Sequence, residues 1–547
     1  MGSYTIGGKS LGAVCVAVGC FQVSFALGEP PGDPLWAISS SLRQQGMNMR
    51  SLGLGVLCVG WLGACAPHRV AHEPTPPLAV PSRYAGAEQT AERTSAQHQS
   101  ESTESAKGWW HDFADPQLNQ LVTGALADNF NVQGAWARLR QAAAAADIAG
   151  APRVPSLGAS LGATYQRLNL ARFGVGGSGL DLFGFAGSLE AGYEVDFWSK
   201  ISDGEQAALL DQHVAADQVQ VVAMTVAAEV AEAYYDVLAA RAGRLLLEQQ
   251  RAVSASLLEL VELRFGEGLA TGVEVSQQRQ QVLGADSALA PLVAVEAVAR
   301  HRLAALLGKQ VGCPGAGPAG GLEAAPEAQA CVQLPESVSL PQVPPPPRTG
   351  VPAELLKRRP DLRAAQRQVE AADYRVAVAV ADRYPSVQLT GSVSSEPSRV
   401  NDWLLSPLWN LAANLTLPLV DGGRRRAEVE RRRAVMAELV ASYGQAVLDA
   451  MMEVENALIQ QRQQRQTIAN VQAQLDVARL TLEQAQLRYG QGTADFVAVL
   501  TALRSQQDVE RALLDAQRQL ISYHIQLCRA LGGTWTASLE DSAQEAS

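Results

Sequence analysis

The sequence predicts an α+β protein in which a membrane-spanning β-sheet is continued by a coiled coil of very long helices, and in which the whole unit occurs twice. Three observations predict this fold class. Residues 263–268 (LRFGEG) recur as residues 487–492 (LRYGQG), at an offset of 224 residues that several other matches share. Segments of about ten residues alternate between apolar and polar side chains, which is typical of transmembrane strands. Two stretches of some 65 residues keep a helical pattern without a break.

The composition narrows the classes of protein to be considered. The 547 residues include 44 Lys and Arg against 55 Asp and Glu, which gives a formal net charge of −11. An acidic chain is a poor nucleic-acid partner, because phosphate binding needs clustered basic side chains. The hydrophobic content of 47% excludes a disordered chain. Since only 5% of the residues are aromatic, the composition favours long, thin helices over a thick globular core.

The first part of the chain is predicted to be an export signal that ends in a lipid attachment site. Arg50 precedes a short apolar stretch that ends in Leu-Gly-Ala before Cys65. This ending resembles the bacterial lipobox, which predicts a signal peptide over 47–64 and a diacylglycerol thioether on Cys65. The alternative is a chance cysteine in an apolar stretch. Residues 1–46 are then an over-extended start, and residues 65–107 are a flexible tether behind the lipid.

The rest of the chain divides into two copies of one unit, 108–310 and 351–534. Each copy is expected to contain a helix, a β-hairpin, a very long helix, a turn and a returning helix. The segment 311–350 between them is rich in Pro and Gly, as in an extended linker. It contains Cys313 and Cys331, which either form a disulfide in an exported protein or remain two unpaired surface thiols.

The two hairpins are predicted over about 155–197 and 385–420. Their alternation places apolar side chains toward lipid and polar side chains toward a lumen. The alternative is a half-buried hairpin of a soluble protein. Three carboxylates share the polar face of the first hairpin, Glu190, Glu194 and Asp196, and we expect them to make a pore that favours cations. For Asp196 the alternative is a position below the membrane, where it binds a neighbouring helix.

Four strands cannot close a barrel, because the smallest membrane barrels have about eight and open edges are not tolerated in lipid. The chain must therefore assemble with copies of itself. Two copies give eight strands and three give twelve, and the strand pattern does not choose between them.

The long helices are predicted over about 200–264 and 424–488. At ~1.5 Å per residue each extends about 100 Å, a length that a coiled coil needs and a globular domain does not. Returning helices follow over about 273–307 and 496–531, and a helix over 353–382 precedes the second hairpin, ending before Pro385. A heptad seam steps by 3 and 4 residues through Ile468, Val471, Leu475, Ala478, Leu482 and Ala485.

Several motifs together resemble the TolC-type outer-membrane efflux proteins, in particular their lipoprotein branch. The motifs are WW and DPQL within 109–118, YEVDFW at 193–198, RRPDLR at 358–363, PLVDGGR at 418–424 and the two R-[FY]-G-x-G turns. The resemblance implies a homotrimer, and therefore a twelve-stranded barrel in the outer membrane that continues as a helical tunnel across the periplasm. It also implies a passive conduit for small molecules, a periplasmic adaptor protein and an inner-membrane pump, often of the RND type.

The glycine-rich turns would then form the periplasmic tip, where the adaptor docks. A glycine in each turn is expected to adopt the left-handed conformation that reverses the chain. In much of the family an Asp ring narrows this tip, but the matching positions here are Ala498 and Thr501. Asp495, one turn away, either replaces these acids in part or caps the start of its helix. The residues implied in docking are Arg264, Gly266, Gly268, Arg488, Gly490 and Gly492.

The sequence contains no catalytic constellation, and its 7 histidines are scattered. We therefore expect neither an enzyme nor a metal site, and no cofactor beyond the covalent lipid at Cys65. The expected location is the outer membrane, with the chain lipid-anchored, membrane-spanning and extended into the periplasm, and residues 535–547 form a tail. Two alternatives remain, a type I secretion conduit with the same fold and a soluble coiled-coil scaffold.

Overall fold

The computed structural model describes residues 68, 70, 74–81, 83–84, 108–168, 180–311, 340–347, 351–395, 407–532 and 534–536. The chain divides into two units, Met1–Cys65 and Ala66–Ser547, and every described residue belongs to the second. The predicted start, signal peptide and lipid site at Cys65 lie outside the described residues, and so do Cys313 and Cys331.

Capping side chains divide the region before the first hairpin into two helices. Asp115 accepts hydrogen bonds from the backbone N–H of Gln117 at 3.0 Å and of Leu118 at 3.2 Å, so the first helix begins there. Asn129 caps the second helix in the same way. The elements of this half are η1 (Trp109–Phe113), α3 (Pro116–Asp128), α4 (Phe130–Gly150), η2 (Ala151–Arg153), β1 (Ser156–Leu168), β2 (Leu180–Val195), α5 (Lys200–Gly266) and α6 (Gly272–Leu306).

A proline also divides the corresponding region of the second half. The single helix expected over 353–382 is wrong, because Pro360 begins a new helix and holds Arg359 in an extended conformation with ψ 118°. The elements of this half are α7 (Pro352–Arg358), α8 (Pro360–Ala381), β3 (Ser386–Ser395), β4 (Leu408–Thr416), α9 (Arg424–Gly490), α10 (Phe496–Ala530) and η6 (Thr534–Thr536).

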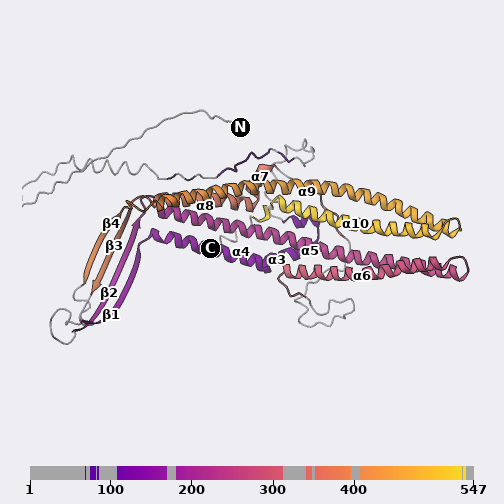
Figure 1. Ribbon diagram of the computed structural model, residues 1–547, viewed down its shortest axis with the longest axis horizontal. Helices are drawn as coiled ribbons and strands as arrows, with labels where there is room; N and C mark the ends of the chain where they lie inside the picture. The colour runs from indigo at the N-terminus through magenta and orange to yellow at the C-terminus, as the bar shows by residue number, and fades with distance from the viewer. Residues whose placement is uncertain are drawn as a thin grey trace, which may run out of the picture. The chain divides into compact units, whose positions relative to one another are not determined.

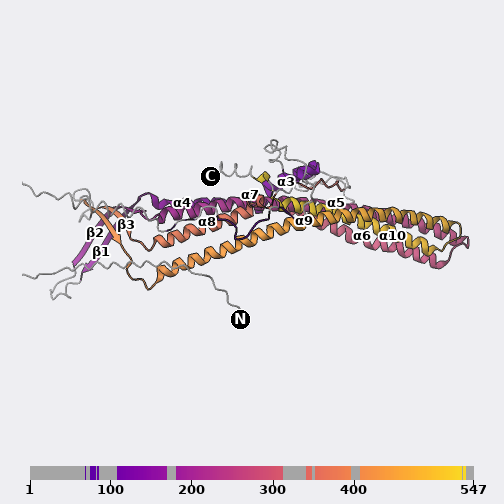
Figure 2. The ribbon, with the colours of Figure 1, turned by 90° about the horizontal axis from the view of Figure 1, so that it is seen from above.

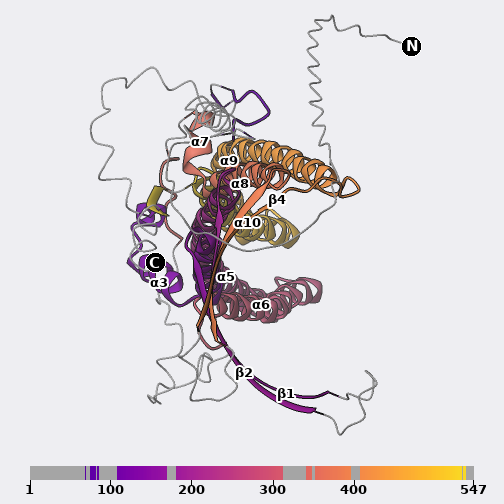
Figure 3. The ribbon, with the colours of Figure 1, turned by 90° about the vertical axis from the view of Figure 1, so that its left-hand side faces the viewer.

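Sheet and helices keep the same lateral order within Ala66–Ser547. The four strands form one antiparallel sheet in the order β1-β2-β3-β4. Beyond it α6 packs on α5, α5 on α10, and α10 on α9, so the helices follow the order α6-α5-α10-α9 (Figure 1). The sheet and the two helix turns lie at opposite ends (Figure 2). The end-on view separates the α5–α6 hairpin from the α9–α10 hairpin (Figure 3).

The apolar core of the described residues is divided into five clusters along the helices. The main cluster joins η1, α3 and the middle of α5 to α10, and a second cluster joins α8 and α9 to the end of α10. A smaller cluster lies near the turns. Along α9 the predicted heptad positions Leu475, Ala478 and Leu482 are buried, whereas Val477 and Leu480 are exposed. Burial on this part of α9 therefore follows the heptad pattern.

Residues of the predicted flexible tether and of the predicted tail contribute to this core. Tyr84, within the predicted tether, is only 2% exposed and belongs to the second cluster. Pro77 lies so close to Gly444 that a Cβ atom there would be 2.8 Å from the proline Cγ. Trp535, in the predicted tail, is 6% exposed and meets the ring of Trp110 edge-on at 4.7 Å. The prediction of a flexible tether is therefore wrong for Pro77 and Tyr84, because their side chains pack on apolar surface of the helices.

Candidate functional site

The sheet keeps apolar and polar side chains on opposite faces across all four strands. Directly paired residues of antiparallel strands lie on the same face. One row across the sheet is Ala159, Leu189, Val393 and Trp409, and it is apolar throughout. The adjacent row points to the other face and consists of Gly158, Glu190, Ser392 and Asn410. With this register the sheet has one apolar face and one largely polar face.

The apolar face is uncovered. Leu161 is 81% exposed and Trp409 is 76% exposed. A soluble antiparallel sheet packs its apolar face on a core, so this exposure indicates a face that meets lipid. Among the described strands, β1 and β4 each have one neighbour, and their open backbone groups are too costly to leave in lipid. The sheet needs lipid on one face and further strands at both edges.

Two of the three predicted lumen carboxylates lie on the polar face, in different surroundings. Glu190 is exposed and accepts a hydrogen bond from the Ser188 hydroxyl at 3.2 Å. Glu194 lies 3.5 Å from Nζ of Lys200, which is also 3.5 Å from a carboxylate oxygen of Asp382. Within the described residues Glu190 has no basic partner, whereas the charge of Glu194 is partly balanced.

The third carboxylate, Asp196, does not belong to the strand. Strand β2 ends at Val195, and Asp196 accepts hydrogen bonds from the backbone N–H of Ile201 at 3.1 Å and of Ser202 at 2.9 Å. The Ser202 hydroxyl donates a further bond at 2.7 Å. The prediction that this carboxylate extends the strand stripe is therefore wrong, because the open N–H groups at the start of α5 bind it. Its alternative position, beside a helix below the strands, matches this geometry.

Aromatic and charged side chains join the ends of the two hairpins. The ring of Trp198 stacks on Tyr384 at 4.7 Å, and its Nε1 donates to the Pro385 carbonyl at 2.8 Å. Arg425, in the first turn of α9, donates to Asp382 at 3.2 Å. Sequence reasoning missed these pairings, because their members are up to 187 residues apart and no local pattern connects them.

The two glycine-rich turns at the far end have the same backbone conformation. Gly268 and Gly492 both have φ +72°, as expected for a left-handed cap. Gly266 and Gly490 are instead the last residues of α5 and α9. The backbone bond that closes each turn runs from Leu269 N–H to the Arg264 carbonyl at 2.8 Å and from Thr493 N–H to the Arg488 carbonyl at 2.9 Å.

The side chains of the two turns differ. The guanidinium carbon of Arg264 lies 4.4 Å from the centre of the Tyr489 ring, and that ring lies 5.4 Å from the ring of Phe496. Tyr489 is 7% exposed, whereas Phe265, at the matching position of the first turn, is 52% exposed. Burial, with the charge of Glu274 as a second cause, raises the pKa of the Tyr489 hydroxyl. The two turns are thus in contact through the side chains of Arg264 and Tyr489.

The positions of the expected tip constriction lie together at the start of α10. Asp495, Ala498 and Thr501 follow one another at intervals of three residues, and all three are exposed. Asp495 occupies the N-cap position, yet its side chain makes no capping hydrogen bond. By contrast, Thr271 and Glu274 form a complete capping box at the start of α6. The hydrogen bond by which the Asp495 side chain would cap α10 is therefore not formed in this structure.

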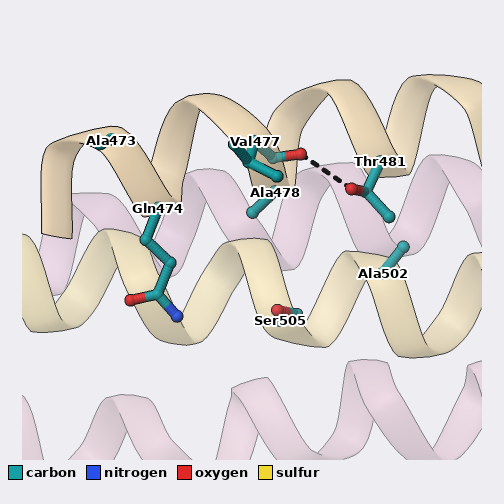
Figure 4. A pocket seen from close by; sticks show the side chains of 7 residues that line it. All are labelled: Ala473, Gln474, Val477, Ala478, Thr481, Ala502 and Ser505. Atoms are coloured by element: carbon teal, nitrogen blue, oxygen red, sulfur yellow. Dashed lines mark hydrogen bonds between the residues drawn. The ribbon is translucent and has the colours of Figure 1, made fainter. Parts of the chain in front are cut away.

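Apolar surface is also left uncovered along the helices. An 18-residue stretch of α6 has a mean hydropathy of 1.6, long and apolar enough to cross a membrane, and only 6% of it is buried. On α9 and α10 a groove of about 450 Å³ is lined mainly by small side chains (Figure 4). Its lining residues are Ala473, Gln474, Val477, Ala478, Thr481, Ala502 and Ser505.

Comparison with known proteins gives a family match over both halves of the chain. A family model described as outer membrane efflux protein matches residues 121–309 and 351–533. These two segments together make up more than half of the sequence, and they fall within the two copies predicted from the internal repeat.

Individual relatives and a solved structure agree with this match. The pyoverdine export outer membrane protein OpmQ of Pseudomonas aeruginosa is 33% identical over 521 residues, which cover 91% of this chain and 100% of the relative. The probable outer membrane lipoprotein SilC of Salmonella typhimurium is 26% identical, over 78% of this chain and 88% of the relative. The structure of the outer-membrane channel OprN has a TM-score of 0.75 and 26% identity, covering 86% of this chain and 100% of OprN.

Proposed function

This chain belongs to the outer membrane efflux protein family, and on that premise we propose that three copies of it close one twelve-stranded barrel and one helical tunnel. The protein is an outer-membrane channel of an efflux system. It lies in the outer membrane and extends into the periplasm. In the proposed trimer, small molecules pass through the helical tunnel and then the barrel to the exterior, without energy input from the channel itself.

The observation that carries this proposal is the sheet, whose apolar face is uncovered and whose two edges are open. An open edge in lipid is unsatisfied, so β1 of one copy pairs with β4 of the next. Two copies would give eight strands, and a barrel of that size has an interior that side chains fill. Twelve strands leave a lumen, which a conduit requires.

The helices support the same head-to-tail arrangement. Strand β1 and helix α6 lie at one lateral edge, and β4 and α9 lie at the other. A contact between unlike edges closes into a ring when the rotation between copies fits. In that ring the apolar side of α6 meets the groove on α9 and α10 of the next copy. Small groove residues such as Ala478 and Ala502 allow close approach of a helix.

The remaining assignments follow from the family and stay proposals for this chain. The turns around Gly268 and Gly492 form the tip where a periplasmic adaptor docks, and an inner-membrane pump of the RND type supplies the energy. Cys65 carries the lipid that anchors the chain to the outer membrane. The relative SilC is described as a probable outer membrane lipoprotein, which supports such an anchor. The pump selects the cargo, and the export of pyoverdine by OpmQ is a property of that relative.

Neighbouring residues of β1 supply a matched test. Leu161 lies on the apolar face and Ser160 on the polar face. An arginine at mid-membrane on a lipid face costs about 2–4 kcal/mol, while a lumen position tolerates it. Leu161→Arg is therefore expected to abolish heat-resistant trimers in outer-membrane fractions, and Ser160→Arg to leave them intact. Purified protein is expected to have the mass of three chains by light scattering and to conduct ions in planar bilayers. A monomer, or a trimer without conductance, would contradict the proposal.

A further inference from the structure

Three arginines at the end of the helical body nearest the sheet have no acidic partner among the described residues. Arg383 lies between α8 and β3, and Arg424 and Arg426 lie in the first turn of α9. All three are exposed. Arg425 differs from them, because it donates to Asp382 at 3.2 Å and to Asp421 at 3.3 Å. Where the helices meet the sheet, Arg425 is therefore bound to carboxylates of the protein, whereas the other three arginines are exposed.

Exposed apolar side chains lie beside these arginines. Beyond the end of β4, Leu417 and Leu419 continue the alternation of its apolar face, and Leu419 is 83% exposed. Val420 is 94% exposed. Phe197, just after β2, is also exposed. The apolar surface of the sheet thus extends past the strand ends and meets the basic side chains there.

This combination matches the boundary between the hydrocarbon and the headgroups of a membrane. Apolar and aromatic side chains anchor at that level, while arginine reaches the lipid phosphates with its planar fork of donors. The strand ends fix the height, because the sheet is the part that crosses the outer membrane. A full charge without a carboxylate partner is complementary to an anionic headgroup.

We propose that Arg383, Arg424 and Arg426 bind the phosphates of anionic phospholipids in the leaflet that adjoins the helical body. Together with Leu419 and Val420 they form a headgroup belt, which fixes the depth at which the barrel sits in the membrane. This proposal depends on the outer-membrane location of the protein and does not depend on how cargo moves through the channel.

The test compares two sets of three arginines, which carry equal charge. In the control set Arg431 and Arg432 are paired with Glu428 at 2.7 Å and 2.8 Å, and Arg433 is paired with Glu430 at 3.1 Å. Full-length protein in detergent is titrated with phosphatidylglycerol and with phosphatidylcholine, and bound lipids are counted by native mass spectrometry. The control variant is R431Q/R432Q/R433Q. The test variant is R383Q/R424Q/R426Q, and R383K/R424K/R426K keeps the charge.

The wild type is expected to bind phosphatidylglycerol at least about tenfold more tightly than phosphatidylcholine, and the glutamine test variant to lose that preference. The control and the lysine variant are expected to stay within about threefold of the wild type. An unchanged preference in the glutamine variant overturns the proposal, and so does an equal loss in the control, because either result removes these three positions from lipid binding. Conductance of the glutamine variant is expected to match the wild type, so failure of the belt and failure of the channel are distinguishable.

Discussion

The guanidinium of Arg264 lies over the ring of Tyr489, 4.4 Å from its centre, so the end of the first long helix is joined to the end of the second. These residues are 225 positions apart in the sequence. They lie in the two turns that form the tip of the proposed tunnel. A contact between the turns within one copy restrains their separation, and its loss has a measurable consequence.

Removing the arginine is expected to loosen the tip. A cation–π contact at a partly exposed site contributes about 0.5–1 kcal/mol, so Arg264→Ala is expected to raise the open probability of the channel about two- to fivefold. Single-channel recording in planar bilayers measures this change. Arg488→Ala is the matched control, since Arg488 occupies the same position of the other turn and is exposed. If both variants behave like the wild type, the contact does not restrain the tip.

The glycines of each turn are expected to respond oppositely to alanine. Gly492 has φ +72°, so Gly492→Ala strains the backbone and costs about 1–2 kcal/mol per chain. Gly490 is the last residue of α9 and has open space around its Cα, so Gly490→Ala is expected to be neutral or to stabilise by up to about 1 kcal/mol. The midpoints of thermal unfolding, followed by circular dichroism, should fall for the first variant only. Equal midpoints would contradict the left-handed assignment.

The two strand carboxylates are expected to contribute unequally to ion preference. Glu190 has no basic partner in the described part of the chain, whereas Glu194 lies 3.5 Å from Lys200. Glu190→Gln is therefore expected to lower the preference for cations more than Glu194→Gln does. Reversal potentials across a salt gradient measure the difference. A larger effect of Glu194→Gln would indicate that Lys200 does not offset its charge in the assembled pore.

A buried histidine in α10 makes stability depend on pH. Burial, with the charge of Arg465 as a second cause, lowers the pKa of His524 to about 4, against about 6.5 in an unfolded chain. As the pH falls below about 6.5 the unfolded chain takes up this proton first, so stability is complete above that pH and is lost progressively toward pH 4. The loss amounts to about 3 kcal/mol per chain.

Replacement of that histidine is expected to flatten the acid side of the stability profile. His524→Gln removes the titrating ring that contacts Gln461 at 2.9 Å. Unfolding midpoints at pH 7 and pH 5 should differ less for this variant than for the wild type. His301→Gln, at an exposed position of α6, is the control and should keep the wild-type difference. A wild-type difference in the His524 variant would assign the acid sensitivity to other groups.

Periodicity made the sheet and the long helices predictable, because alternation and heptads are repeated many times along each element. Single residues that end an element were harder to place. Alternation continues through Asp196, yet the strand stops one residue earlier, because the open N–H groups of α5 bind that carboxylate. Pro360 is a local signal for a helix break, and the prediction of one helix over 353–382 did not take it into account.

Long-range partners could not be predicted from the sequence. Nothing near Lys200 indicates that it lies 3.5 Å from Asp382, and nothing near Trp198 indicates that it stacks on Tyr384. Tyr84 lies in a segment whose composition suggests a flexible tether, and Trp535 lies in the predicted tail. The burial of both depends on surfaces that helices distant in sequence supply. The candidate tip, by contrast, was found from the sequence because its motif occurs twice.

The two turns have the same backbone conformation but different surface side chains, since Phe265 is exposed and Tyr489, at the matching position, is buried. Around a threefold axis, three copies would present six helix hairpins of two alternating kinds. The rim would then have threefold and not sixfold symmetry. An adaptor that touches every hairpin must recognise two unlike footprints, either with two binding modes of one protein or with six sites that differ in occupancy.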